Sequence, residues 1–293
     1  MFETTVVDGV CRFERPGTTW LSTGPVGGRF RADAAYNCTV PDPWEPTAID
    51  AYVADRLARA GFDDEPGPTL LTGVDQAHAR GARCGPVTAV ATAGVTNPAS
   101  LPPVPTGGSL PTVEPLEASA SGTGGDGAGS GVDGAGETAT DTADETATDA
   151  TDDTATDATD DTVTDATDET ETEYRPGTVN VLVGTTRALD SGALANLVAV
   201  TAEAKAATVL AATGFTGTTT DAVIVGCDPT GPEARFTGSA TPVGAATRAC
   251  VRESVTAALG AWVADGGSVP DSVESASYGI STDVRADVFS PGE

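Results

Sequence analysis

Basic side chains and histidine are scarce in this sequence of 293 residues. It has 15 Lys and Arg against 43 Asp and Glu, and a single His, so its formal net charge is -28. Nucleic-acid binding needs clustered Lys and Arg to neutralise phosphates, so this composition argues against a nucleic acid as a partner. With His78 alone, a multi-His metal site is excluded, and a Ser-His-Asp arrangement could be built only on that residue. A place on a helix surface is the expected role of His78.

Cysteine pairs and long apolar runs are also missing. The five cysteines form no C-x-x-C motif and are odd in number, which argues against a disulfide framework and a zinc ribbon. No apolar run reaches the roughly 18 residues of a membrane span, and the N-terminus lacks the basic and apolar regions of a signal peptide. The sequence therefore predicts a soluble cytoplasmic protein without a membrane partner; its oligomeric state stays open.

Lysine is almost absent among the few basic residues, because 14 of the 15 are Arg and the other is Lys205. An acidic, Lys-poor surface is typical of a salt-rich cytoplasm, where screening to about 3 Å at 1 M salt weakens self-repulsion. The composition indicates a halophilic source. A merely acidic, Arg-biased protein is the alternative.

One segment, residues 101–174, holds 19 of the 43 acidic residues and no Lys or Arg. Its first part is rich in Pro, Gly and Ser, and residues 138–169 repeat an eight-residue unit of Thr, Ala and acidic residues four times. Such a unit has no aliphatic face to bury, which predicts a disordered linker. A calcium-binding repeat would need turn glycines and inward-facing apolar residues, which the units lack. An interaction or solubility tail is a further alternative.

The first half, residues 1–100, predicts short strands followed by one helix. Strands are expected at 4–10, 11–13, 20–22 and 35–40, between Gly and Pro turns. A helix is expected from Pro46 to Gly61, with its apolar residues on one face. An apolar run at 86–95 predicts a buried strand that leads into a turn at 96–98.

The second half, residues 175–293, alternates strands and long helices. Strands are expected at 178–184 and 222–226, and helices from Asp190 or Ser191 to about residue 212 and from Thr241 to about residue 266. Residues 214–220 are expected to form a loop. Neither half offers a convincing core alone, so we predict a mixed α/β fold of α+β layers, a single domain interrupted by the acidic insert.

The expected helix at 190–212 is apolar nearly all round, yet it carries Glu203 and Lys205. These two side chains stand about 200° apart around the axis, so each needs a partner elsewhere. Unlike Arg, a desolvated Lys can lose its proton, which suits a general base or acid. Thr201, one turn earlier on the same face, is a possible hydroxyl partner. A lysine on a partly exposed turn is the alternative.

Residues 214–221, GFTGTTTD, place hydroxyls and a carboxylate between a helix end and a strand start. The segment is not a P-loop, because no Gly-Lys-Ser/Thr follows, and H-E-x-x-H, G-x-S-x-G and G-x-G-x-x-G are absent from the whole sequence. Taken alone, it is typical of a polar connecting loop.

Several stretches, in this order, resemble the adenosylcobinamide amidohydrolase family of corrinoid salvage. They are WLSTGPVGG (20–28) with Asn37, TAGVTN (92–97), GTVNVLV (177–183), TAEAKAATVLAATGFTGTTTDAVIV (201–225) and GSATPVG (238–244). The match covers nearly all of both halves and bridges the linker. Family members join the second and third stretches by a short loop, whereas residues 98–176 intervene here, and LLTGVD (70–75) is a looser match.

The resemblance implies a haloarchaeal-type enzyme that hydrolyses the amide of adenosylcobinamide, giving adenosylcobyric acid and 1-aminopropan-2-ol. The corrinoid is then the substrate, and no cofactor or metal is expected. A non-catalytic corrinoid carrier is the alternative.

Amide hydrolysis needs an activated nucleophile, oxyanion donors and a proton for the amine. The base could be Lys205 or Glu203, with Asp221 orienting the lysine, and the nucleophile could be Thr201 or a threonine of 218–220, with Thr220 the catalytic candidate. Trp20, Trp44 and Trp262 could line a corrinoid pocket or pack in the core. Within the matching stretches, the expected substrate-binding residues are Ser22, Gly27, Gly28, Asn37, Asn97, Asn180, Thr218 and Thr219, with Asn97 or Asn180 as amide donors.

Overall fold

Strands from the two sides of the acidic insert share one sheet. The computed structural model describes residues 1–25, 27–41, 44, 48–62, 66–101 and 177–291. The sheet order is β4-β3-β2-β10-β8-β6-β5, with β1 paired to β2, so the second-half strands β8 and β10 lie between strands of the first half. The predicted mixed α/β fold, built from both halves, is confirmed. The predicted linker lies outside the described residues, apart from Leu101.

The strands of this large sheet run in both directions, and a small second sheet lies beside it. Strand β10 is parallel to β8 and antiparallel to β2, and β6 is antiparallel to β8. The large sheet contains β1 (Glu3–Val7), β2 (Val10–Ser22), β3 (Gly28–Thr39), β4 (Thr69–Thr72), β5 (Arg80–Cys84), β6 (Val87–Ala93), β8 (Val179–Thr185) and β10 (Ala222–Cys227). The small sheet contains β7 (Pro98–Ser100), β9 (Gly217–Thr218) and β11 (Ile280–Ser281).

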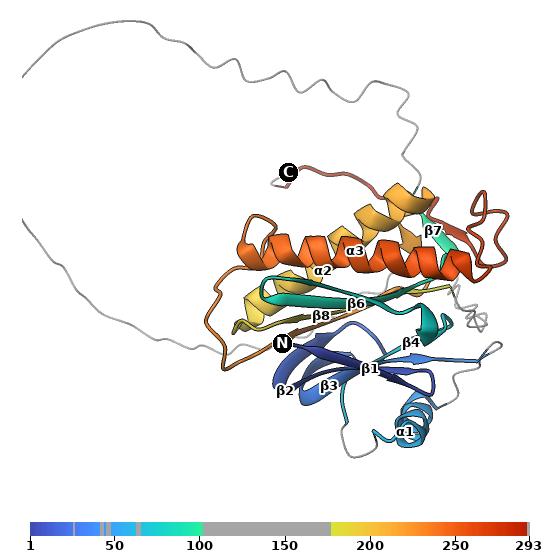
Figure 1. The fold of residues 1–293 in the computed structure, drawn as a ribbon. Coiled ribbons are helices and arrows are strands. Elements are labelled where there is room, and N and C mark those ends of the chain that lie inside the picture. Colours follow the sequence, from blue (N-terminus) through green and yellow to red (C-terminus); the bar gives the residue numbers. More distant parts are fainter. Residues whose placement is uncertain (26, 42–43, 45–47, 63–65, 102–176, 292–293) are drawn as a thin grey trace, which may run out of the picture. The chain divides into compact units, whose positions relative to one another are not determined.

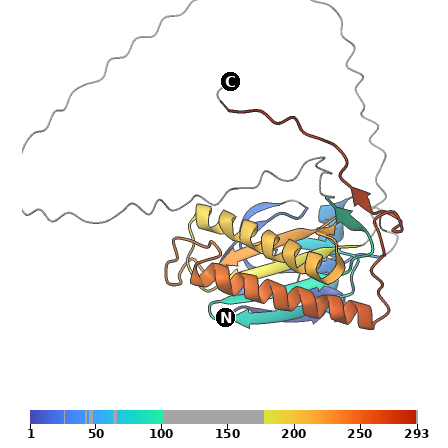
Figure 2. The same ribbon diagram turned by 90° about the horizontal axis from the view of Figure 1, so that it is seen from above.

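The large sheet bends so that its two ends face each other, with helices outside each face (Figure 1). Helices α2 (Ser191–Thr213) and α3 (Pro242–Ala264) cover β6, β8 and β10, and α1 (Ile49–Arg59) lies against β3. Seen from above, α2 and α3 lie side by side over the sheet (Figure 2). A core with Trp20, Leu70 and Leu182 fills the space between the two sheet layers. Because side chains alternate along a strand, each inner strand contributes to two cores.

The long helices begin and end where the sequence predicts. The Asp190 side chain accepts a hydrogen bond from the Ala193 amide, and Gly214 ends α2 in a left-handed conformation with φ 82°. Thr241 caps α3 through the Gly244 amide, with a proline at the start of the helix. These contacts satisfy amide groups that a helix terminus leaves without partners.

We expected no apolar run long enough to span a membrane, but helix α2 meets the length and composition of such a span. This is weak evidence for a membrane span, because core helices pass the same test. Half of its most apolar window is buried inside the protein, against the sheet and α3. Its all-round apolar character therefore has a structural reason within this fold.

Strand boundaries differ most from the sequence prediction. The strand expected at 4–10 is broken at Asp8 and Gly9, whose φ values of 45° and 70° form the turn between β1 and β2. The strands expected at 11–13 and 20–22 are one strand, β2, with a register shift between Glu14 and Thr18. The short strands β4, β5, β7 and β9 were not predicted, and β7 and β9 overlap an expected turn and loop. A strand of four residues or fewer, or an exposed strand at the edge of a sheet, has too few alternating apolar residues to be recognised from the sequence.

The histidine and the cysteines have structural environments. His78 ends a short 3₁₀ helix (Gln76–His78), where its Nε2 lies 3.1 Å from a carboxylate oxygen of Asp265. All five cysteines are free, and only Cys84 is exposed. Burial raises the pKa of the Cys11 thiol to about 12, so it behaves as a small apolar core residue.

Candidate functional site

A buried ion pair lies where α2 approaches the beginning of β10. The Lys205 ammonium group donates to Oδ2 of Asp221, and the two side chains are only 10% and 12% exposed. Lys205 is carried by the buried face of α2, and Asp221 directly precedes β10. The sequence prediction that Asp221 orients Lys205 therefore agrees with this contact.

Asp221 accepts hydrogen bonds from three further donors. The Val179 amide donates to Oδ1 over 2.8 Å and the Thr218 amide to Oδ2 over 3.1 Å, while the Thr218 hydroxyl also donates to Oδ1. A carboxylate offers about four acceptor sites, so the donors, Lys205 included, fill the capacity of Asp221. The carboxylate is thus held in one orientation.

Gly217 makes room for this ion pair. A Cβ atom at this position would lie 2.5 Å from Oδ2 of Asp221 and 3.6 Å from Nζ of Lys205. The first distance is shorter than side chains tolerate. A side chain at position 217 would therefore displace the Asp221 carboxylate from its present position.

Asp221 also lines a small cleft of about 250 Å³. Asp221 is the only ionisable side chain among the described residues that line it, and Lys205 lies behind Asp221 rather than in the wall. The lining residues are Thr23, Gly24, Pro25, Trp44, Ile49, Leu71, Thr220, Asp221 and Ala222. The cleft therefore combines an apolar wall with one fixed carboxylate, as small-molecule sites commonly do.

Two threonine hydroxyls line this cleft, and they differ in their partners. The Thr23 hydroxyl accepts from the Val223 amide over 2.9 Å and lies 3.2 Å from the Val223 carbonyl oxygen. The Thr220 hydroxyl lies 2.9 Å from that of Thr178 and 3.2 Å from the carbonyl oxygen of Gly177. Thr23 thus completes the pairing of β10, whereas Thr220 belongs to a chain of hydroxyls beside Asp221.

A buried network joins Asn37, Thr92 and Asn180 between the two sheet layers. The Asn37 amide donates to the Thr92 hydroxyl, and the Asn180 amide donates to Oδ1 of Asn37 and to the carbonyl of Leu71, all within 2.9 Å. Both N–H groups of Asn180 are therefore engaged, which argues against its expected role as an oxyanion donor. Since Leu71 lines the cleft, the network supports the cleft wall from behind.

The other residues expected in the site have different places. Ser22 accepts from the Gly24 amide over 3.1 Å and so shapes the turn at the cleft. Gly27 packs against the backbone of that turn, and Gly28, with φ 122°, begins β3. Asn97 is buried, and its carbonyl accepts from the Thr219 amide over 3.2 Å, which links the two family stretches. Thr219 itself is exposed.

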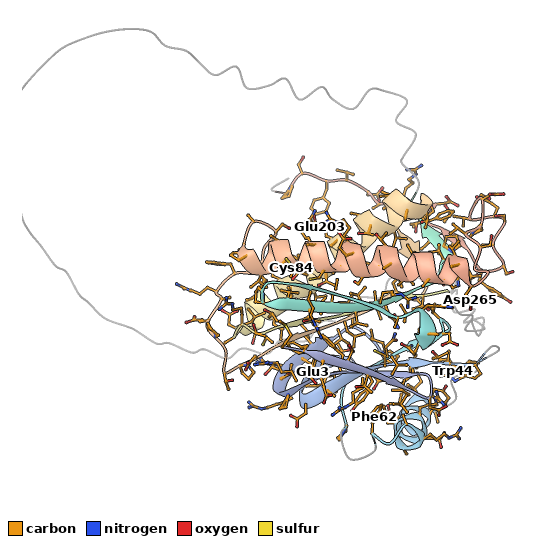
Figure 3. All side chains as sticks on the ribbon, in the orientation of Figure 1. Glu3, Trp44, Phe62, Cys84, Glu203 and Asp265 are labelled. Atoms are coloured by element: carbon orange, nitrogen blue, oxygen red, sulfur yellow. The ribbon has the colours of Figure 1, made fainter. Side chains whose placement is uncertain are left out.

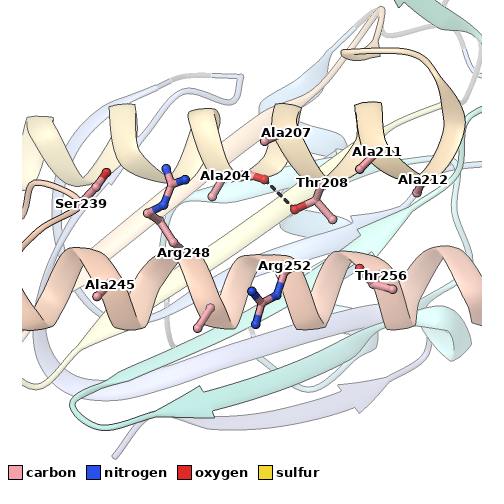
Figure 4. Close-up of a pocket in the computed structure, with 11 residues that line it drawn as sticks. Ala204, Ala207, Thr208, Ala211, Ala212, Ser239, Ala245, Arg248, Arg252 and Thr256 are labelled. Carbon is pink, nitrogen blue, oxygen red and sulfur yellow. Dashed lines mark hydrogen bonds between the residues drawn. The ribbon is translucent and has the colours of Figure 1, made fainter.

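Two of the catalytic candidates lie away from the cleft. Glu203 is paired with Arg248 over 2.6 Å on the exposed outer side of the helices (Figure 3). The groove beside Arg248, about 580 Å³ between α2 and α3, is lined largely by alanines (Figure 4). Among the described residues, none lines both this groove and the cleft. Thr201 is fully buried, and its hydroxyl donates to the Leu197 carbonyl within the helix. The structure therefore brings Asp221 together with Lys205, Thr218 and Thr220, and it leaves Glu203 and Thr201 outside this group.

The tryptophans divide between core and cleft. Trp20 packs with Phe2 and Phe13 in the inner core, and Trp262 contacts the core beneath the helices. Trp44 lines the cleft and packs against Tyr52, with ring centroids 5.3 Å apart and ring planes tilted by 50°. Sequence reasoning missed Thr23, Gly24, Pro25, Ile49 and Ala222, although residues 23–25 directly follow Ser22 in a family stretch. No group of three or more potential metal ligands occurs among the described residues.

Comparison with known proteins agrees with an enzyme acting on a small molecule. A family model described as adenosylcobinamide amidohydrolase matches residues 5–267. An adenosylcobinamide amidohydrolase of Halobacterium salinarum is 49% identical over 294 aligned residues, which cover 99% of this chain and all of that protein. No solved structure matches. The chain is thus a hydrolase and belongs to the adenosylcobinamide amidohydrolase family.

Proposed function

We propose that the cleft beside Asp221 is where this chain hydrolyses adenosylcobinamide. The reaction of the family is hydrolysis of the amide between the corrinoid and 1-aminopropan-2-ol, with adenosylcobyric acid as the other product, in corrinoid salvage. The observation that carries the assignment of the site is the fixed Asp221 carboxylate in the wall of a cleft that the family stretches 20–28 and 201–225 build together.

Asp221 acts as a fixed negative charge in this proposal. Its acceptor sites are filled by Lys205, Thr218 and the Val179 amide, so it is poorly suited to take a proton from water. The amine that leaves the amide becomes an ammonium ion once protonated. A carboxylate in the cleft wall stabilises that developing positive charge, because opposite charges attract more strongly in a cleft than in bulk water. Lys205 is then a positioning residue.

Thr220 is the nucleophile in this proposal, since it is the candidate hydroxyl that lines the cleft beside Asp221. Its oxygen bonds to the amide carbon, the C–N bond breaks, and the hydroxyl proton ends on the departing amine nitrogen. Water then cleaves the resulting ester, which restores the Thr220 hydroxyl and yields the carboxylic acid. Thr178, 2.9 Å away, holds the hydroxyl in place.

The test is turnover of adenosylcobinamide in high salt, with both products followed by mass spectrometry. We expect Thr220→Val and Asp221→Asn to lower kcat by about 10²-fold or more, and Thr220→Ser to retain part of it. Thr216→Val is the matched control, because Thr216 is an exposed threonine of the same loop outside the cleft. Wild-type turnover in Thr220→Val would exclude the nucleophile, and wild-type turnover in Asp221→Asn would exclude this cleft.

The corrinoid is the expected small-molecule partner, with no resident cofactor and a cytoplasmic location. These proposals follow from the composition and from the substrate itself. Dialysis against a chelator before the turnover assay tests the cofactor proposal, since a metal-free enzyme should keep its full rate. Neither comparison favours the carrier alternative, because both name a hydrolase.

A further inference from the structure

We infer that an apolar groove next to the cleft binds the corrin ring of the substrate. This inference rests on the proposed function of the cleft. The groove has a volume of about 250 Å³ and shares Pro25 and Ile49 with the cleft, so the two are continuous. A substrate whose scissile amide lies beside Thr220 and Asp221 therefore extends into the groove.

The groove consists of one face of α1 and the segments opposite it. Ile49, Val53 and Leu57 recur on that face at helical spacing, and Phe30 of β3 and Pro68 line the groove as well. Ile49, Val53 and Phe30 are only partly buried, so part of their apolar surface is open to a ligand. Asp50 is the one ionisable side chain among the described lining residues.

The chemistry of the substrate matches this surface. A corrin is a broad macrocycle that carries methyl groups between its amide-bearing side chains, and the scissile amide is joined to it by a short aliphatic arm. When the amide occupies the cleft, an edge of the ring must therefore lie at the mouth of the cleft, where the groove begins. Burying that edge against Phe30 and Val53 removes apolar surface from water, which stabilises the bound ring.

The larger groove between α2 and α3 is a poorer candidate for the ring. No residue that the structure describes lines both this groove and the cleft, and Arg248 and Arg252 of the groove are paired with Glu203 and Glu253. A ring in that groove could not place its amide beside Asp221, because Lys205 and the body of α2 intervene.

Ala54→Glu tests the inference without disturbing the core. Ala54 is an exposed residue of α1 that lines the groove, so a glutamate there puts a charge against the bound ring. Ala51→Glu is the matched control, because Ala51 is an exposed alanine of the same helix that lines neither groove nor cleft. We expect Ala54→Glu to raise the KM for adenosylcobinamide about tenfold, with kcat and the unfolding transition unchanged, and Ala51→Glu to leave KM unchanged.

Binding of cobyric acid separates the ring from the other parts of the substrate. Dicyano-cobyric acid has neither the aminopropanol nor the adenosyl group, and we expect Ala54→Glu to weaken its binding by the same factor, measured by equilibrium dialysis. Wild-type binding of dicyano-cobyric acid by Ala54→Glu would overturn the inference. Loss confined to adenosylated corrinoids would assign the groove to the nucleoside and equally overturn it. Failure of the proposed function shows separately, as unchanged turnover in Asp221→Asn.

Discussion

Replacing Lys205 by methionine removes one charge of the buried pair and leaves the Asp221 carboxylate without its cation. Methionine matches the length and volume of the lysine stem, so the packing of α2 is kept. Both side chains of the pair are about nine-tenths buried. Breaking a buried pair by removing one partner costs about 3–5 kcal/mol, because the remaining charge is desolvated and uncompensated.

Three other donors remain on Asp221 in this variant, namely the Val179 amide and both groups of Thr218. We therefore place the expected loss at the lower end, about 3 kcal/mol. Denaturant unfolding in high salt, followed by circular dichroism, measures it. Because Lys205 positions the carboxylate, kcat should fall by about 10²-fold while KM changes little.

A double replacement separates the ion pair from general damage. The variant that combines Lys205→Met with Asp221→Asn leaves neither side chain of the pair charged. It should therefore regain part of the stability that Lys205→Met loses, while staying inactive. Lys205→Arg keeps the positive charge but replaces the compact ammonium by a planar guanidinium, so we expect it to retain more stability than Lys205→Met and to turn over more slowly than wild type. If Lys205→Met unfolded within about 0.5 kcal/mol of wild type and kept full turnover, the reasoning about the pair would be wrong.

Four more predictions follow from the structure. Gly217→Ala should reduce turnover about as strongly as Asp221→Asn, since its Cβ would lie 2.5 Å from the carboxylate; a fully active variant contradicts the contact. Burial raises the pKa of Asp228, but hydrogen bonds from Thr230 and Arg15 outweigh this effect and lower the pKa to about 2. The ionised carboxylate therefore stabilises the fold at pH values above its usual pKa, and this stabilisation is lost as the pH falls toward 2. In an acid titration, the free energy of unfolding of Arg15→Gln should fall less steeply than that of wild type. Native protein should take up one thiol reagent, at exposed Cys84, counted by mass; more would show that the fold opens. Deleting residues 105–172 should preserve corrinoid binding and turnover, because the cleft is built by described residues on both sides of this segment; lost turnover in the folded protein would give the insert a role.

Much of the secondary structure could be predicted because its signals are local. Asp190, Gly214, Thr241 and Pro242 begin or end helices through contacts a few residues away, and the apolar runs in β6 and β8 mark strands whose neighbours cover both faces. The turn at Asp8 and Gly9 was missed. Only these two residues have the positive φ values that form the turn, and the residues on both sides of them have a strand-like pattern.

The candidate site was only partly predictable. The sequence by itself determined that Lys205, on an apolar helix, needs a partner and that the segment ending at Asp221 is rich in polar groups. It could not say that Glu203 turns outward to Arg248 while Lys205 turns inward, since a helix of nearly uniform apolarity does not reveal which side faces the sheet.

The tertiary structure alone decided which residues form the cleft. Residues 23–25, Trp44 and Leu71 come from the first half of the chain, and residues 220–222 from the second. They meet because β10 pairs with β2 and because the bent sheet brings β4 near β8. Strand pairing over such separations depends on the packing of the whole core rather than on local sequence, so no short stretch encodes it.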